Sequence, residues 1–547
     1  MSRLNPPHQE KGYLAIVLHA HLPFVRHPEN SSHLEELWLF EAITDTYLPL
    51  LEVMQGWVDD GVPFRLTLSV TPTLACMLAD PLLQRRYVQH LERSIALAHQ
   101  EMLRTRGEPA FHRLARMYRD RFEKAREAFL HRYRKDLLGA LAHFTRHGLE
   151  LIASAATHAL LPLTEPYLSA ARAQIQAGVE HHRRVFGLDP AGFWLPECGY
   201  CRSLDPFLLD QGIRYTFTDT HGLLHGVPRP KYAVFAPVYT PRGLAVFGRD
   251  VETSKQVWSA TEGYPGDFDY REFYRDIGHD LPWEYLAPYL PWGVRADTGL
   301  KYYRITGRTP HKEPYDPERA QWKARLHAHN FVFNRVHQVR YLREHMDRRP
   351  VVVAPYDAEL FGHWWFEGPW FLDEVVRRIH EVDHDVRLVT PSGYLDEHPT
   401  QQVVEVSSST WGYKGYFEVW LEGSNDWIYR HLHRAAERME ELAQRFTRPS
   451  PVEARALNQA ARELMLAQSS DWAFIMKTGT VVEYAVRRTR EHLHRFFTLA
   501  DQLAAGRVDE GYLEELEARD NLLPFVDYRA FRPQPGQPAG LATGARI

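Results

Sequence analysis

Cysteine is scarce in this sequence, and long apolar runs are missing. Only 3 of the 547 residues are cysteine, Cys76, Cys198 and Cys201, too few for the disulfide framework of a secreted protein. The first residues, MSRLNPPHQEKG, lack the apolar segment of a signal peptide. No run approaches the roughly 18 apolar residues of a membrane helix. We therefore expect a cytoplasmic protein that does not contact a membrane.

An excess of charge of one sign is also missing. The 65 Lys and Arg residues are scattered among 70 Asp and Glu residues, for a net charge of -5. This balance gives no reason to expect a nucleic acid partner. The glycine-rich patterns GxGxxG and GxxxxGK[ST] do not occur, so nothing supports a nucleotide-binding sheet.

Short apolar runs recur along the first 400 residues, and helical patterns separate many of them. Near-continuous apolar strands that alternate with helices predict an α/β fold with a parallel sheet, either open or closed into a barrel. The predicted strands are residues 13–18, 64–69, 149–153, 193–195, 213–218, 244–248, 351–354 and 386–389.

Polar side chains follow almost every one of these strands. In a (β/α) barrel the carboxyl ends of the strands form one face that carries the active site, and in an open sheet they form one edge. The side chains in question are His19, His21, Thr71, His158, Glu197, Asp219, Arg249, Asp250, Asp357, Thr390 and Ser392.

Composition also suggests how the chain is divided. We expect a catalytic unit over residues 1–400, with an amphipathic helical excursion at 80–147 and an inserted loop or small domain over the active site at 200–250. Residues 401–526 contain three amphipathic patterns that predict a C-terminal helical domain. Residues 527–547 are rich in Pro and Gly and predict a disordered tail.

The segment VVVAPYDAELFGHWWFEGP, residues 351–369, joins a predicted strand to acids, a histidine and two tryptophans. Carboxylates perform acid/base chemistry at acetals, and flat aromatic rings stack on sugars, so the segment is typical of a carbohydrate-processing site. The alternative is a buried loop whose tryptophans are only core. The acid we single out is Asp357.

A second acid, Glu197, lies in WLPECGYC and follows another predicted strand. Two carboxylates on one rim are what glycoside chemistry needs, one as nucleophile or base and the other as proton donor. The same stretch holds the CxxC of Cys198 and Cys201. A redox or zinc site is one interpretation of this CxxC, and two reduced thiols beside a pocket is the other.

Two further patterns leave alternatives open. The pair His19 and His21 could bind a divalent metal, donate hydrogen bonds to sugar hydroxyls, or be structural. The aromatic stretch STWGYKGYFEVWLEGSNDW includes Trp411 and Trp420 and could guide a glucan chain or form a seam between domains.

The sequence resembles glycoside hydrolase family 57. LHAHLPF, SAATHALLPL, WLPECGY, PYDAELFGHWWFEGP and SSDWAFIMKTG are similar to its five conserved regions, in order, from residue 13 to about residue 495. The HAHLPF opening, VWSATEGYPGDFDYREFYRDIG and TWGYKGYFEVW most resemble the 1,4-α-glucan branching enzymes of that family.

The resemblance implies a (β/α)7 barrel with a small inserted domain and a C-terminal helical domain. It implies a retaining mechanism without a metal or other cofactor, with Glu197 as nucleophile and Asp357 as general acid/base. Tyr232 and Tyr239 are the candidates for the family's tyrosine on a flexible loop. The substrate-binding candidates, which include Arg249 after its strand and Trp258 in VWSATEG, are His19, His21, His158, Arg249, Trp258, Trp411, Trp420, Asp471 and Trp472.

The function we expect is cleavage of an α-1,4-glucan, such as amylose or glycogen, and transfer of the chain to a 6-hydroxyl, by a monomer or a homodimer. Alternatives on the same site are an α-amylase or a 4-α-glucanotransferase. From other classes, the chain could be a metal-dependent hydrolase that uses His19, His21 and Asp357, or a catalytically silent glucan-binding protein.

Overall fold

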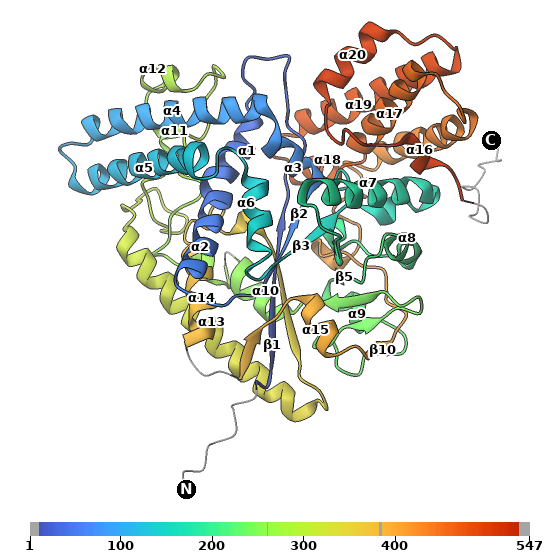
Figure 1. Cartoon of the computed structure of the whole chain (residues 1–547). Helices are drawn as coiled ribbons and strands as arrows, with labels where there is room; N and C mark the ends of the chain where they lie inside the picture. The colour runs from blue at the N-terminus through green and yellow to red at the C-terminus, as the bar shows by residue number, and fades with distance from the viewer. Residues whose placement is uncertain (1–9, 260, 382–384, 535–547) are drawn as a thin grey trace.

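A computed structural model describes residues 10–259, 261–381 and 385–534 (Figure 1). All eight predicted strands form, and most of their residues are buried, as expected for a sheet covered by helices. They are β1 (Gly12–Ala20), β2 (Leu66–Val70), β3 (Leu149–Ser154), β4 (Gly192–Trp194), β5 (Tyr215–Thr218), β7 (Ala245–Gly248), β8 (Val351–Asp357) and β9 (Val386–Leu388).

Seven of these strands form a parallel barrel in the order β8-β1-β2-β3-β4-β5-β7. The ring closes where the backbone N–H of Asp250, just after β7, donates to the carbonyl of Val353 in β8 at 3.0 Å. The predicted (β/α)7 barrel is confirmed. The eighth strand, β9, pairs only with the first residues of β1, and two short strands, β6 (Val238–Tyr239) and β10 (Gln402–Val403), extend the sheet beside β7.

Helices surround the barrel and bury their apolar faces against it (Figure 1). Several begin where a strand-end residue caps them, as Thr71 does for α3 and Asp250 for α10. The surrounding helices are α1 (Glu36–Ala42), α2 (Leu48–Asp59), α3 (Pro72–Ala79), α6 (Leu137–Phe144), α7 (Leu168–Phe186), α8 (Asp205–Asp210), α9 (Thr220–Leu224), α10 (Val251–Trp258), α13 (Pro317–His345), α14 (Gly368–Glu381) and α15 (Pro391–Glu397).

The predicted helical excursion is a projecting hairpin of α4 (Pro81–Arg104) and α5 (Pro109–Glu127). Residues 261–316, with the short helices α11 (Ile277–Asp280) and α12 (Trp283–Leu286), pack against it. Contacts include the Tyr118 hydroxyl, which donates to the Lys301 carbonyl at 2.7 Å.

This packing corrects the expected position of the insertion. Residues 200–250 are not a separate small domain, because they supply β5 and β7 of the ring itself. The segment inserted between elements of the barrel is 261–316, which lies between α10 and α13. Turn-forming composition is similar in both segments, so it did not distinguish them.

The described part of the C-terminal helical domain contains five α-helices and lies beside the barrel (Figure 1). Three match the predicted amphipathic patterns, and two short ones, α18 and α20, were not predicted. A capping box of Ser450 and Glu453 begins α17. The helices are α16 (Trp427–Arg445), α17 (Pro451–Ala467), α18 (Ser470–Thr478), α19 (Val482–Ala504) and α20 (Glu510–Arg519).

The predicted disordered tail begins too early. Tyr528 and Phe531 are buried, and the Tyr528 hydroxyl donates to the Phe446 carbonyl at 2.7 Å. Residues 527–534 therefore belong to the helical domain. The remainder of the predicted tail, 535–547, lies outside the described residues.

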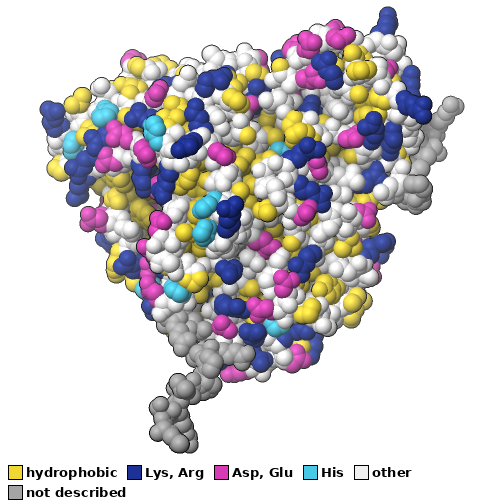
Figure 2. Space-filling model, viewed as in Figure 1, with side chains coloured by type: hydrophobic (Ala, Val, Ile, Leu, Met, Phe, Trp, Pro, Cys, Tyr) yellow, Lys and Arg dark blue, Asp and Glu magenta, His cyan; other side chains and the backbone are white. Residues whose placement is uncertain are grey.

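The surface carries mixed charge. Figure 2 shows acidic and basic side chains interspersed over the visible face, in agreement with the small net charge of -5. Among the described residues, no helix combines the length and apolarity needed to cross a membrane.

Candidate active site

The barrel register brings the predicted strand-end residues to one face. His19 in β1 pairs with Ser69 in β2 on one side and with Asp357 in β8 on the other. All three lie near the carboxyl ends of their strands, so the face that the sequence predicts is the one the fold builds.

Glu197 follows β4 in a 3-10 turn, Pro196–Cys198. Glu197 and Cys198 have φ of 60° and 50°, and His158 has φ of 57°. These values lie in the left-handed region, which residues other than Gly rarely occupy. Backbone strain of this kind persists where the surroundings impose it, which is often at functional sites.

Two donors hold the Glu197 carboxylate. The indole N–H of Trp411 donates to Oε2 at 2.8 Å, and the Ser470 hydroxyl lies 3.2 Å from Oε1. Burial raises the pKa of Glu197 to about 7, against the lowering effect of these donors. Trp411 is fixed in turn, because its backbone N–H donates to the Glu197 carbonyl at 2.9 Å.

Asp357 ends β8 in a half-buried position. Burial raises its pKa well above the usual range, and the carboxyls of Glu359 and Glu197 raise it further, while Arg249 lowers it. Its surroundings therefore favour the protonated form of Asp357, whereas Glu197 is the one supplied with donors for its ionised form. Two carboxyls with different environments are the pattern of a paired acid and nucleophile.

Arg249 follows β7 and contacts Asp219, Ser254 and Trp411. Its Nη1 lies 3.5 Å from Oδ2 of Asp219, and its Nε donates to Ser254 at 2.6 Å. The guanidinium also lies over the Trp411 ring, 5.4 Å from its centroid.

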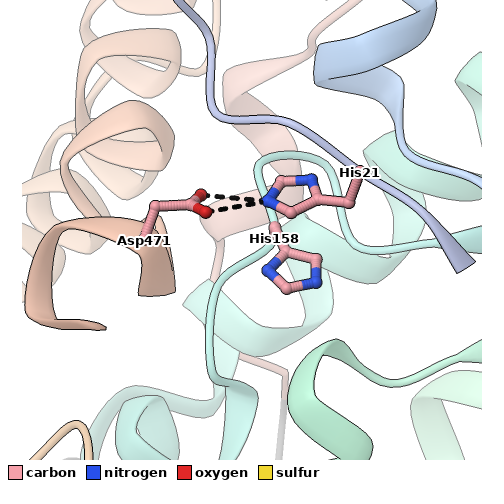
Figure 3. A group of neighbouring side chains, drawn as sticks. All are labelled: His21, His158 and Asp471. Atoms are coloured by element: carbon pink, nitrogen blue, oxygen red, sulfur yellow. Dashed lines mark hydrogen bonds and ion pairs between the residues drawn. The ribbon is translucent and has the colours of Figure 1, made fainter. Parts of the chain in front are cut away.

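Three histidines stack near Glu197, and Nδ1 of His158 lies 3.8 Å from its Oε1. His21 and His158 are nearly parallel at 3.7 Å between ring centroids, and His19 lies 5.1 Å from His158. Figure 3 shows Asp471 pointing at His21, whose Nε2 lies 3.0 Å from one carboxylate oxygen. Burial raises the pKa of Asp471, but His21, His158 and Ser469 together lower it to about 2.

The group His21, His158 and Asp471 has the ligand types of a metal site, with its ligand atoms within 4.8 Å of one another. The stacking does not suit one, because lone pairs of parallel rings run side by side and do not converge on an ion. Both His158 nitrogens also have protein partners already. These residues therefore fit a hydrogen-bonding role better than a metal-binding one.

A second group, Glu463, His492 and Asp520, is buried in the helical domain. Arg495 donates to Asp520 at 2.9 Å, and Glu463 lies 2.7 Å from His492. Arg495 and Arg488 pair with Asp520, and burial lowers the pKa of His492 so that it meets Glu463 as a neutral hydrogen-bond partner; the group is therefore a polar network of the core.

Glu359, which is buried, is a third acid on the rim. The Tyr47 hydroxyl donates to its Oε1 at 2.5 Å, and the backbone N–H of His21 donates to the same oxygen at 3.1 Å. Burial raises the pKa of Glu359 to about 7. The contact with the His21 backbone ties the end of β1 to the segment that carries Asp357.

The predicted aromatic residues divide into two groups. Trp411 is half-buried at the site, and Trp258 is 45% exposed with its ring edge-on to Trp364 at 5.9 Å. Trp420 and Trp472 are only 1% and 0% exposed, so neither presents a free ring face for a sugar. Both pack in the core of the structure described here.

The structure does not bring the two candidate loop tyrosines to the site. Tyr232 donates to Asp347, which precedes β8, and Tyr239 pairs with Ala245, the first residue of β7. Both therefore lie at the amino ends of the strands, on the opposite side of the barrel from Asp357.

The CxxC cysteines are free thiols. Burial raises the pKa of Cys198, and nearby Asp219 raises it further. Burial likewise raises the pKa of Cys201 to about 12. Thiols held protonated are poor nucleophiles and poor metal ligands, so the interpretation as two reduced thiols beside the site fits best.

Sequence reasoning missed Ser69, Tyr47, Ser470 and the role of Glu359. Ser69 stands inside a predicted strand and Tyr47 inside a helix, positions that look structural in a sequence. Ser470 was available in SSDWAFIMKTG, next to the predicted Asp471, but nothing in the sequence alone aims its hydroxyl at Glu197.

Comparison with known proteins finds matches over most of the chain. The profile described as glycosyl hydrolase family 57 matches residues 15–407, and that described as 1,4-alpha-glucan branching enzyme, C-terminal, matches residues 431–531. A 1,4-alpha-glucan branching enzyme of Thermococcus kodakarensis is 34% identical, covering 94% of this chain and 77% of its own.

Two solved structures are similar over nearly their whole length. The alpha-amylase AmyC of Thermotoga maritima has a TM-score of 0.89 and 44% identity, covering 96% of this chain and 99% of its own. A GH57-type branching enzyme of Pyrococcus horikoshii has a TM-score of 0.86 and 33% identity, covering 96% and 97%. The relatives thus share one fold and carry two activity names.

Proposed function

The chain belongs to glycosyl hydrolase family 57, and we propose that it is a retaining 1,4-α-glucan branching enzyme. The observation that carries the proposal is the half-buried pair of Glu197 and Asp357 on the barrel rim. Glu197 has two donors for its ionised form, whereas burial and two neighbouring carboxyls favour the protonated form of Asp357. The match of residues 431–531 to the C-terminal region of branching enzymes supports branching as the outcome.

In the first half of the reaction, the Glu197 carboxylate attacks the anomeric carbon of an α-1,4-linked glucan. The bond from that carbon to the leaving oxygen breaks, and Asp357 gives its proton to that oxygen. A glycosyl-enzyme ester on Glu197 results, and the reducing-end fragment leaves with a free 4-hydroxyl.

In the second half, Asp357 is a carboxylate and acts as the base. It takes the proton of a 6-hydroxyl on another glucan, whose oxygen attacks the anomeric carbon. The ester bond to Glu197 breaks, an α-1,6 linkage forms, and both carboxyls return to their starting states. Two inversions at one carbon give net retention.

Other residues near the pair have distinct tasks in this proposal. His19, His21 and His158 offer nitrogen donors and acceptors to sugar hydroxyls, and Asp471 holds the orientation of His21. Trp411 holds Glu197 and presents its ring beside the site. Arg249 moderates the negative charge between the carboxyls.

Hydrolysis is the second candidate function, and two observations favour it. The relative with 44% identity is described as an alpha-amylase, and neither candidate loop tyrosine lies over the site in this structure. A site open to solvent lets water compete with the 6-hydroxyl for the glycosyl-enzyme.

Incubation with amylose separates branching from hydrolysis and from transfer to a 4-hydroxyl. The enzyme is mixed with unbranched amylose, and α-1,6 linkages and reducing ends are counted in the same samples over time. Branching predicts that new α-1,6 linkages outnumber new reducing ends. Reducing ends without branches would establish an α-amylase, and longer unbranched chains would establish a 4-α-glucanotransferase.

A further inference from the structure

We propose that Ser470 is a positioning residue for Glu197, and that a chain of hydrogen bonds running from Ser69 through His19 and His158 sets the direction of its hydroxyl. The inference rests on the proposed role of Glu197 as nucleophile. It extends the site to Ser69, a side chain that is 0% exposed and that substrate cannot reach.

Four contacts make up the chain. Ser69 Oγ lies 3.2 Å from His19 Nδ1, and His19 Nε2 lies 2.9 Å from His158 Nε2. His158 Nδ1 lies 2.9 Å from Ser470 Oγ, which lies 3.2 Å from Glu197 Oε1. Each distance is within hydrogen-bond range, so the series is continuous from Ser69 to the carboxylate.

The backbone fixes the members of the chain independently of substrate. The register of β1 and β2 places Ser69 directly beside His19. The backbone N–H of Ser470 donates to the His158 carbonyl at 3.0 Å, which docks the start of α18 on the loop after β3. The side chains therefore meet because a strand pair and a helix–loop contact bring them together.

The number of protons on the two histidines means that all hydrogen bonds in the series run in the same direction, from donor to acceptor. Burial lowers the pKa of both His19 and His158 well below the usual range, so each ring is neutral, with one N–H donor and one acceptor nitrogen. Once one hydrogen bond is oriented, every other bond in the series must follow. The direction of the hydrogen bond at one end of the series therefore determines the direction of the bond at the other end.

An ionised Glu197 can only accept, so it orients the whole series toward itself. Ser470 then donates to Glu197, His158 Nδ1–H donates to Ser470, and His19 Nε2–H donates to His158. Ser69 donates to the remaining acceptor, His19 Nδ1. A protonated Glu197 would donate to Ser470 and reverse every bond.

The series of hydrogen bonds therefore stabilises the ionised form of Glu197, and removal of a donor raises the pH at which Glu197 ionises. Trp411 holds the other oxygen and is unaffected by such a change. The titratable groups that face Glu197 from the elements around it are His21, His158, Cys198, Asp357 and Asp471.

The test compares Ser470→Ala, Ser69→Ala and the double variant, with the pH dependence of kcat/KM for amylose cleavage as readout. Loss of a hydrogen bond to a charged group predicts a fall in kcat of about 10- to 100-fold for Ser470→Ala. Loss of a bond between neutral groups predicts about 2- to 10-fold for Ser69→Ala, with KM nearly unchanged. The acid limb moves to higher pH in both.

The double variant is expected to be no worse than Ser470→Ala, because both changes break one series. Ser94→Ala is the matched control: it removes a buried serine hydroxyl that donates to the His90 carbonyl, away from the site. Additive effects of Ser69→Ala and Ser470→Ala, or a Ser69→Ala profile identical to wild type, would overturn the inference.

Neutron diffraction on the wild-type protein gives a second readout that does not depend on variants folding. Above the pH at which Glu197 ionises, deuterium is expected on Nε2 of His19 and Nδ1 of His158. The opposite tautomers would overturn the inference. Glu197→Gln tells the two proposals apart, because near-normal activity in that variant would reject the proposed function itself.

Discussion

At the scale of single residues, the site is organised around differences between chemically similar carboxyls. Glu359 is buried and Glu197 and Asp357 are half-buried, and desolvation raises the pKa of each. Their partners distinguish them: Glu197 has an indole and a serine, Glu359 a tyrosine and a backbone amide, and Asp357 two acidic neighbours and Arg249. The roles follow from these surroundings.

The pH dependence of activity is the first consequence. In the proposed mechanism, cleavage requires ionised Glu197 and protonated Asp357, so the rate is expected to fall when pH drops through the pKa of Glu197. With that pKa at about 7, the acid limb of kcat/KM is expected near pH 7 and not near the ordinary glutamate value of about 4.3. A pH profile measured on amylose checks this, and an acid limb near pH 4 would contradict it.

At the scale of elements, two segments from outside the barrel complete the site. The stretch after β10 delivers Trp411, and α18 delivers Ser470 and Asp471. The barrel alone supplies the two carboxyls but neither of the donors to Glu197. The helical domain is therefore part of the active site.

Trp411→Phe tests the contribution of the first segment. The substitution keeps an aromatic ring but removes the indole N–H that donates to Glu197 at 2.8 Å. Loss of a hydrogen bond to a charged group predicts a fall in kcat of about 10- to 100-fold. Trp322→Phe on the surface of α13, where the ring is 56% exposed, is the control and should leave kcat unchanged. Equal kcat values for the two variants would show that the indole N–H of Trp411 does not contribute to catalysis.

The elements also show what the sequence could predict. All eight apolar runs became strands, because buried parallel strands must be apolar on both faces. The strand-end residues His19, Glu197 and Asp357 followed from that assignment. The short helix α18 was not predicted, since its 9 residues span too few turns for a clear periodic pattern.

The position of Tyr232 and Tyr239 could not be predicted for a different reason. Composition marks a loop but does not say at which end of a barrel it lies. Only the pairing of β6 with β7 and the contact between Tyr232 and Asp347 place these residues at the amino ends of the strands. The contact of Ser470 with Glu197 was similarly hidden, because it joins positions 273 residues apart.

At the scale of the whole molecule, the 261–316 insertion lies beside the α4–α5 hairpin, and the helical domain lies on the other side of the molecule (Figure 1). The last described residues anchor the helical domain, since Phe531 is 0% exposed and Tyr528 donates to the Phe446 carbonyl. The domain in turn holds α18 against the site. Stability at the C-terminal end is thereby linked to catalytic geometry.

Phe531→Ala tests that link. Removal of a buried Phe side chain costs about 3–5 kcal/mol of stability, so the midpoint of urea unfolding should fall. Phe268→Ala, at a position that is 61% exposed, is the control and should leave the midpoint nearly unchanged. If both variants unfolded at the same urea concentration as wild type, residues 527–534 would not anchor the domain.

The central claim is that Glu197 carries the glucan chain between donor and acceptor as a covalent ester. The most direct measurement is mass spectrometry of peptides from Asp357→Ala after reaction with a maltosyl donor whose leaving group needs no protonation. Without the base, the ester should accumulate on the peptide that contains Glu197, and the added mass should be absent from the same peptide of Asp357→Ala/Glu197→Gln. Turnover of the donor with no modified peptide, or a label on another residue, would contradict the account.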